Sequence, residues 1–245
     1  MTSSRPDLGD SASVSDARAL ARALRQQLVG LQALGVSTIP RAPQISDRAV
    51  ESVEAGGTRS KMARLARLAK EVAGCKQCPL HRTRTQAVFG DGDPDAKLVF
   101  VGEAPGRDED LQGKPFVGAA GRLLNKMIEA MGLRRQEVYI CNVLKSRPPG
   151  NRPPLPEEIE ACLPFLQKQL SIIEPRVICV LGSVAAKSLL GPQVSIMKIR
   201  GEVRDYLGIP LVPTFHPAYL LRNPSAKRLA WADLKRVKQL LSEIG

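Results

Sequence analysis

Three short apolar runs, each followed by polar residues and then by a helix-like pattern, constrain the fold of this chain most strongly. They are KLVFVG at 97–102, VYICNVL at 138–144 and RVICVLG at 176–182. Segments 119–132, 156–173 and 183–191 read as helices, and two more strands are predicted near 203–206 and 210–214. Strands that alternate with helices form a mainly parallel sheet covered on both faces. The sequence therefore predicts an α/β fold.

Net charge points to an acidic polymer as partner. The 245 residues carry a formal charge of +12, which favours nucleic acid first and an anionic membrane second. The membrane interpretation is weak, because no apolar run approaches the roughly 20 residues that a spanning helix needs. The start, MTSSRPDLGDSASVSD, lacks the basic-then-apolar order of a secretory signal. We therefore expect a cytoplasmic protein without a membrane partner, and a monomer by default.

The first 60 residues form a separate extension in this interpretation. They hold seven Lys and Arg and six Asp and Glu, so nearly all the excess positive charge lies beyond them. Leucines at spacings of four and three predict one amphipathic helix from Asp16 to Leu34, and a Pro-, Gly- and Ser-containing linker follows it. The helix either packs on its own core or docks a replication or repair partner. The main domain then spans 61–245 and opens with a helix at Lys61–Ala73.

Loops at the carboxyl ends of parallel strands are where such sheets build sites, and the first of them is 102–118. Gly102 and Gly106 allow close backbone approach, while Glu103 and Glu109 bring carboxylates to the sheet edge. The loop lacks both GxGxxG and GxxxxGK[ST], so it is not a phosphate-binding loop of either kind. Phe116 offers a flat ring that can stack on a base. The alternative is a solvated turn with a buried phenylalanine.

The second and third loops, 142–152 and 216–228, add hydrogen-bonding and basic groups. Asn142 ends a strand, and its amide presents a donor and an acceptor side by side, which suits a nucleobase edge; alternatively, it caps the strand. Arg147 suits a phosphate. His216 is followed by apolar residues and Arg222, the combination that a wedge into a base stack needs. A lone histidine is otherwise most often structural.

The five cysteines argue for metal binding or plain burial, since an odd number without an export signal does not favour disulfides. Cys75 and Cys78 form a C-x-x-C with metal-ligand spacing, and Cys162 lies on the 156–173 helix. Cys141 and Cys179 sit in the middle of predicted strands, and we expect both to be buried.

Together these segments resemble the family 4 uracil-DNA glycosylases, the iron–sulfur branch of the uracil-DNA glycosylase superfamily. The resemblance rests on CKQC, GEAPGRDEDLQGKPFVGAAG, YICNVLKSRPPGNRPP with EEIEAC, and HPAYLLR, in the expected order over residues 61–245. It implies a three-layer α/β/α sandwich with a central four-stranded parallel sheet. It also implies excision of uracil from DNA, as the first step of base excision repair of deaminated cytosine.

The resemblance assigns roles to individual residues. Phe116 would stack on the flipped uracil, Asn142 would read its N3–H and O4, and His216 would donate to O2. Glu109 would position water, because Ala104 stands where other branches carry a catalytic Asp. Further residues would line the pocket (Glu103, Ala104, Gly106) or fill the gap left by the extruded nucleotide (Leu220, Leu221, Arg222).

One departure from the family concerns its [4Fe–4S] cluster, which has four cysteine ligands. The third belongs to a K-C-R-P-P stretch, but this chain has Ser146 there, so the expected ligands are Cys75, Cys78, Ser146 and Cys162. Three outcomes are open: Ser146 ligates a full cluster, the cluster lacks one iron, or Cys141 substitutes after local rearrangement.

Two other functions compete with the enzyme. One is a catalytically weak DNA-binding or polymerase-associated module on the same fold, which the basic charge fits equally well. The combination of Phe116, Asn142 and His216 favours the enzyme, because a binding module would not require all three. The other is a variant that traps its product covalently, which the loop PPGNRPP disfavours because it offers no histidine nucleophile.

Overall fold

A six-stranded sheet forms the centre of the structure, a computed structural model that describes residues 47–243, with side chains from residue 57 onward. The strand order is β1-β3-β2-β4-β6-β5. The four inner strands pair in parallel, while β1 and β5 pair antiparallel at the two edges. The strands are β1 Asp91–Gly92, β2 Leu98–Gly102, β3 Tyr139–Asn142, β4 Val177–Leu181, β5 Arg204–Tyr206 and β6 Ile209–Thr214.

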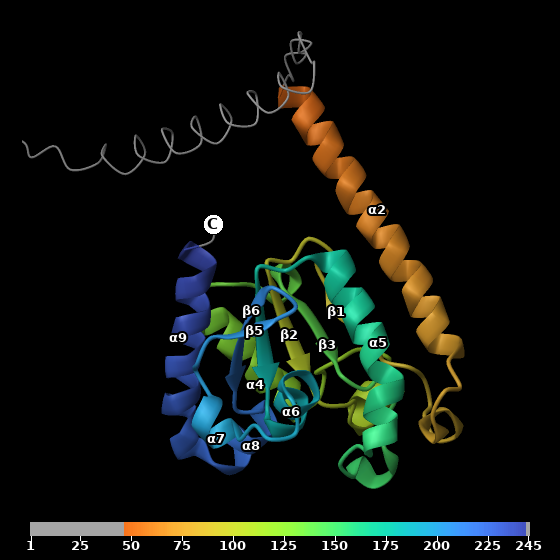
Figure 1. Ribbon diagram of the computed structural model, residues 1–245, viewed down its shortest axis with the longest axis vertical. Helices are drawn as coiled ribbons and strands as arrows, with labels where there is room; N and C mark the ends of the chain where they lie inside the picture. The colour runs from red at the N-terminus through yellow and green to blue at the C-terminus, as the bar shows by residue number, and fades with distance from the viewer. Residues whose placement is uncertain (1–46, 244–245) are drawn as a thin grey trace, which may run out of the picture. The chain divides into compact units, whose positions relative to one another are not determined.

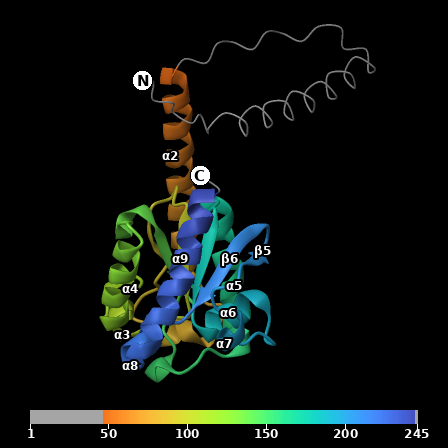
Figure 2. The same cartoon turned by 90° about the vertical axis from the view of Figure 1, so that its left-hand side faces the viewer.

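Helices cover both faces of this sheet (Figures 1 and 2). Residues of α2, α5 and α6 pack in one core cluster with the side chains of one sheet face. Residues of α4 and α9 pack with the other face. The helices are α2 Asp47–Gly74, α3 Arg107–Gln112, α4 Ala119–Ala130, α5 Pro156–Ile173, α6 Ser183–Leu190, α7 Ile196–Ile199, α8 Pro217–Arg222 and α9 Lys227–Glu243.

The apolar runs of the sequence are buried because successive side chains of each inner strand point to opposite core clusters. In β2, for example, Val99 and Val101 belong to the cluster under α5, and Leu98 and Phe100 belong to the cluster under α4. Every residue of β2, β3 and β4 is buried. This confirms the expected layers and the four parallel strands, to which the structure adds the two antiparallel edge strands.

One sequence expectation was wrong about the start of the first described helix. The linker was predicted to reach residue 60, but α2 begins at Asp47 and runs through Gly56 and Gly57. A glycine inside a helix costs only about 1 kcal/mol relative to alanine, so a helix can continue through it. The predicted helix Asp16–Leu34 lies outside the described residues, and the domain boundary at residue 60 stays a prediction.

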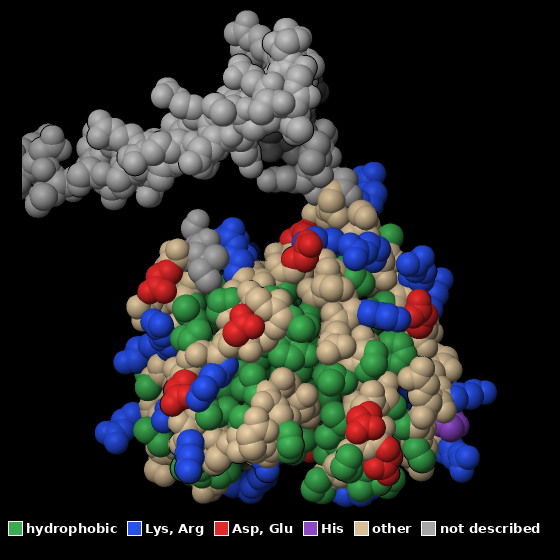
Figure 3. Space-filling model, in the orientation of Figure 1, with side chains coloured by type: hydrophobic (Ala, Val, Ile, Leu, Met, Phe, Trp, Pro, Cys, Tyr) green, Lys and Arg blue, Asp and Glu red, His purple; other side chains and the backbone are tan. Residues whose placement is uncertain are grey.

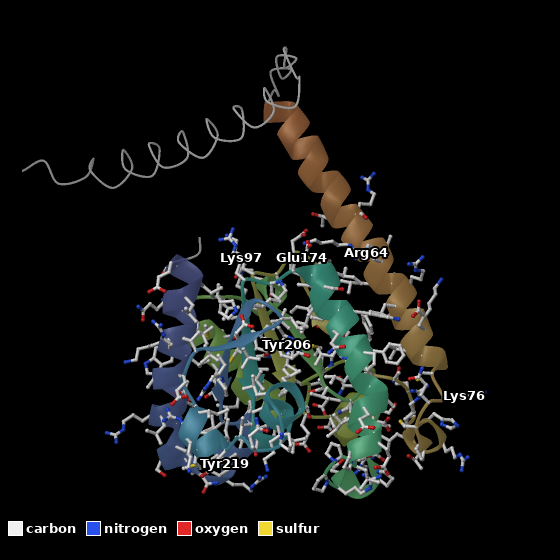
Figure 4. All side chains as sticks on the ribbon, viewed as in Figure 1. Arg64, Lys76, Lys97, Glu174, Tyr206 and Tyr219 are labelled. Carbon is white, nitrogen blue, oxygen red and sulfur yellow. The ribbon has the colours of Figure 1, made fainter. Side chains whose placement is uncertain are left out.

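The carboxyl ends of the parallel strands all point to one end of the sheet. In Figure 4, Lys97, which precedes β2, lies at the top of the sheet, and Tyr219 of α8 lies at the bottom. The strand order places β3 and β4 on opposite sides of β2. The chain therefore crosses from β2 to β3 in one direction and from β3 past β2 to β4 in the other. Sites in open α/β sheets form at such switch points, which directs attention to the loops after β2, β3 and β6.

Basic side chains are prominent on the surface. Figure 3 shows Lys and Arg side chains along the α2 edge of one face, where Arg59, Arg64, Arg67 and Lys70 are exposed. No helix among residues 47–243 is long and apolar enough to cross a membrane.

Two leucines of α9 test how much the packing of the sheet contributes to stability. Leu234 is buried in the core against the sheet, whereas Leu229 on the same helix is exposed. We expect Leu234→Ala to lower the free energy of unfolding by about 2–5 kcal/mol and Leu229→Ala to change it by about 0.5 kcal/mol or less. Chemical denaturation measures both, and equal effects would contradict this packing.

Candidate functional site

A pocket of about 430 Å³ opens at the carboxyl ends of the parallel strands. Its volume is typical of small-molecule sites. It is built from the loop after β2 with α3, the start of α4, the loop after β3 and the start of α8. Its lining residues are Glu103, Ala104, Pro105, Gly106, Glu109, Phe116, Ala120, Asn142, Pro148, Asn151, Arg152, His216, Ala218, Tyr219 and Arg222.

Asn142 brings an unsatisfied acceptor to this pocket. The residue is the last of β3, it is paired in register with Gly102 of β2, and only 2% of it is exposed. Its Oδ1 has no hydrogen-bond partner, the only such buried side-chain atom in the described residues. A buried polar atom without a partner is costly. Asn142 is therefore arranged to accept a hydrogen bond from a ligand.

Phe116 lies beside Asn142 because the neighbouring strand end is a glycine. A Cβ placed on Gly102 would lie 2.4 Å from Asn142 Oδ1 and 2.6 Å from Phe116 Cζ, so any side chain at this position would displace one of the two. The Phe116 ring also lies 5.5 Å from the His216 ring between centroids. The aromatic ring, the amide and the imidazole thus meet in one pocket.

Glu109 ties the two arms of the first loop together. Its Oε2 accepts a hydrogen bond from the N–H of Gly106 at 3.1 Å, and its Oε1 accepts from Val117 at 2.9 Å and Gly118 at 3.0 Å. A Cβ on Gly106 would lie 2.7 Å from Oε2, so the glycine is required for this contact. A carboxylate has about four lone-pair sites, so one acceptor site of Glu109 remains.

His216 is held as a neutral ring with a defined tautomer. Its Nδ1 accepts a hydrogen bond from the N–H of Ala218 at 3.1 Å, which leaves the proton on Nε2. Burial, and to a lesser extent the nearby Arg222, lower the pKa of His216 to about 4, while Glu109 partly opposes this shift. The ring is therefore a neutral Nε2–H donor near pH 7.

Burial also shifts the pKa of a second titratable group in the pocket. Burial raises the pKa of the Glu103 carboxyl above its ordinary value.

The backbone carbonyl of Glu103 accepts a hydrogen bond from the N–H of Leu144 at 3.0 Å, which continues the β2–β3 pairing past the strand ends. The backbone at Glu103 is therefore held by the same kind of pairing as the strands.

The residues expected to contact DNA lie in different environments in the structure. Leu220 is 1% exposed and packs in the core with α4 and α9, which corrects its expected place in the wedge: its side chain anchors α8. The neighbouring Leu221 is 44% exposed and Arg222 lines the pocket. Arg147 lies outside the pocket lining, and its Nε donates to Asn151 Oδ1 at 2.7 Å.

Several pocket residues were absent from the sequence-based set. Arg152 forms a two-pronged pair with Glu158, at 2.9 Å and 2.5 Å. Its place among the basic residues of the loop after β3 was a signal, because such side chains suit phosphates. Tyr219 was visible as an aromatic in the HPAYLLR loop. The others have no functional signature of their own: Pro105, Ala120, Pro148, Asn151 and Ala218.

A second, smaller cavity gathers the cysteines that the sequence singled out. Cys75, Cys78, Cys162 and Ser146 all line it, together with Val72, His81, Arg84, Lys145 and Phe165. Burial raises the pKa of the Cys78 and Cys162 thiols, and backbone hydrogen bonds partly oppose this. Among the described residues, no three His, Cys, Asp or Glu side chains are placed to hold a single metal ion. Cys141 and Cys179 are fully buried in β3 and β4, as expected.

Comparisons with known proteins agree on one family. Residues 89–235 match the model of the uracil DNA glycosylase superfamily. A type-4 uracil-DNA glycosylase of Thermotoga maritima is 48% identical over 182 residues, covering 73% of this chain and 95% of the relative. Type-4 uracil-DNA glycosylases of Archaeoglobus fulgidus and Sulfurisphaera tokodaii are 44% and 46% identical, covering 71% and 73% of this chain and 91% and 86% of the relatives.

The pKa of His216 predicts how stability depends on pH. The unfolded chain takes up a proton at His216 near its ordinary pKa of 6.5, whereas the folded chain does so only near 4. The unfolded state therefore binds more protons between these values, and stability falls as pH falls from about 6.5 towards 4. We expect His216→Asn to weaken this dependence in denaturation measured at pH 7 and pH 5. An unchanged dependence would show that His216 is not buried neutral.

Proposed function

The chain belongs to the uracil-DNA glycosylase superfamily, and we propose that its pocket binds a uracil turned out of DNA and hydrolyses the N-glycosidic bond. It is a monofunctional uracil-DNA glycosylase that leaves an abasic site. Water supplies a hydroxyl to C1′ of the sugar, and uracil leaves with the bonding electron pair and then takes a proton. The enzyme must therefore stabilise negative charge on the base and admit water on the opposite face of the sugar.

The unsatisfied Oδ1 of Asn142 is the observation that carries this proposal. Uracil presents an N3–H donor next to the O4 acceptor, which is complementary to an amide with Oδ1 and Nδ2. Cytosine has an unprotonated N3 next to an amine, so it would leave Oδ1 without a partner. A site that loses a buried hydrogen bond in this way rejects the wrong ligand strongly.

His216 is suited to stabilise the leaving group. As the bond breaks, negative charge develops on uracil O2, and a preorganised neutral donor can hydrogen-bond to it. One such donor is typically worth roughly 3 kcal/mol. The Ala218 contact keeps the proton on Nε2, so the donor is in place before the reaction begins. Phe116 supplies the flat apolar surface on which the base stacks.

Glu109 supports the attack of water without acting as a free base. Three backbone N–H groups already bind its carboxylate, and its remaining acceptor site can orient one water molecule. The carboxylate also contributes negative charge beside a sugar that becomes cationic. We assign Glu109 this positioning role because Ala104, on the same loop, has no polar side-chain atom.

The DNA backbone would be bound around the mouth of the pocket. Arg222 lines it, and Leu221 and Tyr219 on the same helix are exposed, so these side chains can enter the gap left by the extruded nucleotide. Arg147 lies on the loop after β3 and suits a phosphate. Cytoplasmic location, a monomeric state and docking of a repair partner by the N-terminal helix stay predictions.

The charged side chains that line the cysteine cavity suit an anionic iron–sulfur cluster. Its lining contains Arg84, His81 and the buried Lys145, but no carboxylate. Lys145 Nζ donates to the carbonyl of Asn142 at 2.7 Å and to Gln169 Oε1, both neutral acceptors. A buried cation without a counter-ion is costly, and thiolates at Cys75, Cys78 and Cys162 would supply the missing negative charge. A bound [4Fe–4S] cluster would tie these segments together and leave the glycosidic chemistry to the pocket.

The position of Ser146 supports its proposed role as the fourth ligand. It is 3% exposed, it lines the same cavity, and its Oγ accepts a hydrogen bond from Arg84 Nη1 at 2.9 Å. The same guanidinium donates to the carbonyls of Ala73 and Cys75. Arg84 therefore connects the serine to the segment that carries the first cysteine ligand.

Removal of the Asn142 amide tests the enzymatic function. On a labelled oligonucleotide with one uracil, we expect strand cleavage after alkali at uracil and none at cytosine or thymine. Asn142→Ala should lower the cleavage rate by about 10²–10³-fold, the range for loss of one catalytic hydrogen-bonding group. The control Gln239→Ala, an exposed amide on α9, should cleave normally. Salt-dependent DNA binding by the wild-type chain without any cleavage would favour the binding module instead.

Iron content tests the role of Ser146. Wild-type protein purified without oxygen should contain about four iron atoms per chain and absorb visible light. Ser146→Ala should lose iron, and Ser146→Cys should keep it, because a thiolate restores the ligand. Full iron content in Ser146→Ala would show that Ser146 is not a ligand. The cleavage assay above does not depend on this result.

A further inference from the structure

We propose that Arg135, which lies outside the pocket, is a positioning residue that holds Phe116 in the orientation needed to stack on the base. Arg135 begins the 3-10 turn Arg135–Glu137, between α4 and β3. The proposal rests on the proposed function, since it concerns how the stacking ring is presented. It adds a residue that is not part of the pocket lining to the groups on which the activity depends.

The backbone of Phe116 needs external support. Its φ is +54°, in the left-handed region that glycine adopts readily and bulky residues avoid. Such a conformation persists only where surrounding contacts impose it, and it is found preferentially at functional sites. Phe116 is also 6% exposed and borders the pocket.

The guanidinium of Arg135 binds the two carbonyl groups at this point of the chain. Its Nη2 donates to the carbonyl of Pro115 at 2.6 Å, and its Nη1 donates to the carbonyl of Phe116 at 3.3 Å. Nη1 also donates to Asn125 Oδ1 on α4 at 2.9 Å. Arg135 therefore fixes the peptide units on both sides of Phe116 and ties them to α4.

Helix α4 also packs closely against the Phe116 carbonyl. A Cβ placed on Gly121 of α4 would lie 1.8 Å from that oxygen, so the first turns of α4 pack directly against it. Beyond Phe116, the N–H groups of Val117 and Gly118 donate to Glu109. The carbonyl groups of Pro115 and Phe116 therefore bind Arg135, and the next two N–H groups bind Glu109. The ring is the part of Phe116 that faces the pocket.

An arginine is specifically suited to this position. Its planar fork can donate to several acceptors in fixed directions, whereas a lysine ammonium is a single point on a flexible chain. The side chain is 24% exposed, and its Nη2 lies 3.9 Å from the carboxylate of Asp91. Asp91 is the first residue of edge strand β1, so the pair also connects the loop to the sheet edge.

The consequence for the reaction is distinct from a general loss of stability. Without Arg135, the backbone at Phe116 can relax, and the ring no longer presents its face to the base. Stacking of one base on an aromatic side chain is worth about 5–150-fold in affinity, which corresponds to about 1–3 kcal/mol. We expect the change mainly in KM for uracil-containing DNA, because stacking is present both before and in the transition state.

A double-mutant cycle on the full chain separates this role from a structural one. Arg135→Met in the wild-type background should lower kcat/KM by about tenfold, whereas the same change in a Phe116→Ala background should lower it by about twofold or less. Arg135→Lys keeps the charge and should fall between wild type and Arg135→Met. The matched control is Arg134→Met, since Arg134 is exposed and pairs with Glu137.

The possible outcomes are decisive. Equal losses from Arg135→Met in the two backgrounds, or no loss in the wild-type background, would overturn the proposal, because Arg135 would not act through the ring. If Arg135→Met does not fold, judged by its thermal unfolding, the same cycle is made with Arg135→Lys and read in the same way. Cleavage of uracil by wild-type protein supports the proposed function under any of these results.

Discussion

The parallel pairing of β2 with β3 is the constraint on which the rest of the site depends. It puts Gly102 directly beside Asn142 and continues past the strand ends, where Val143 and Leu144 donate to the carbonyls of Gly102 and Glu103. The amide of Asn142 is thereby held with the rigidity of a buried sheet. The absent side chain at Gly102 leaves the space that the amide and the Phe116 ring share.

Charged side chains, some buried and some half-buried, then attach the loops to this frame. Glu109 binds three backbone N–H groups, and Arg135 binds two backbone carbonyls. Asp110 accepts from the N–H and the hydroxyl of Thr85, which connects α3 to the segment after the cysteine pair. Asp233 of α9 accepts from Thr214 and Arg200, which holds the end of β6 before His216. Charge-assisted hydrogen bonds of this kind are strong and directional, so irregular loops can present a precise surface.

The cysteine cavity and the pocket are joined by one short segment of chain. Asn142 lines the pocket. Three residues later, the side chain of Lys145 donates to the Asn142 carbonyl, and Lys145 also lies close to Cys162. Gln169 extends this contact to Tyr139 and to the carbonyl of Phe89. A series of direct contacts therefore connects the cysteine cavity to the backbone of Asn142.

The sequence by itself determined the layers, the four parallel strands and the loops that form the pocket, because apolar runs and helix patterns depend on local periodicity. It also indicated Phe116, Asn142 and His216, which the structure brings together, and the three cysteines and Ser146 that share one cavity. Only the tertiary structure decided what depends on contacts between distant segments. Leu220 and Leu221 are identical in type and adjacent, yet one is buried under α4 and α9 and the other is exposed. Likewise, nothing local distinguishes Arg135 from Arg134, and only the path of the loop before α4 places two carbonyl groups within reach of one of them.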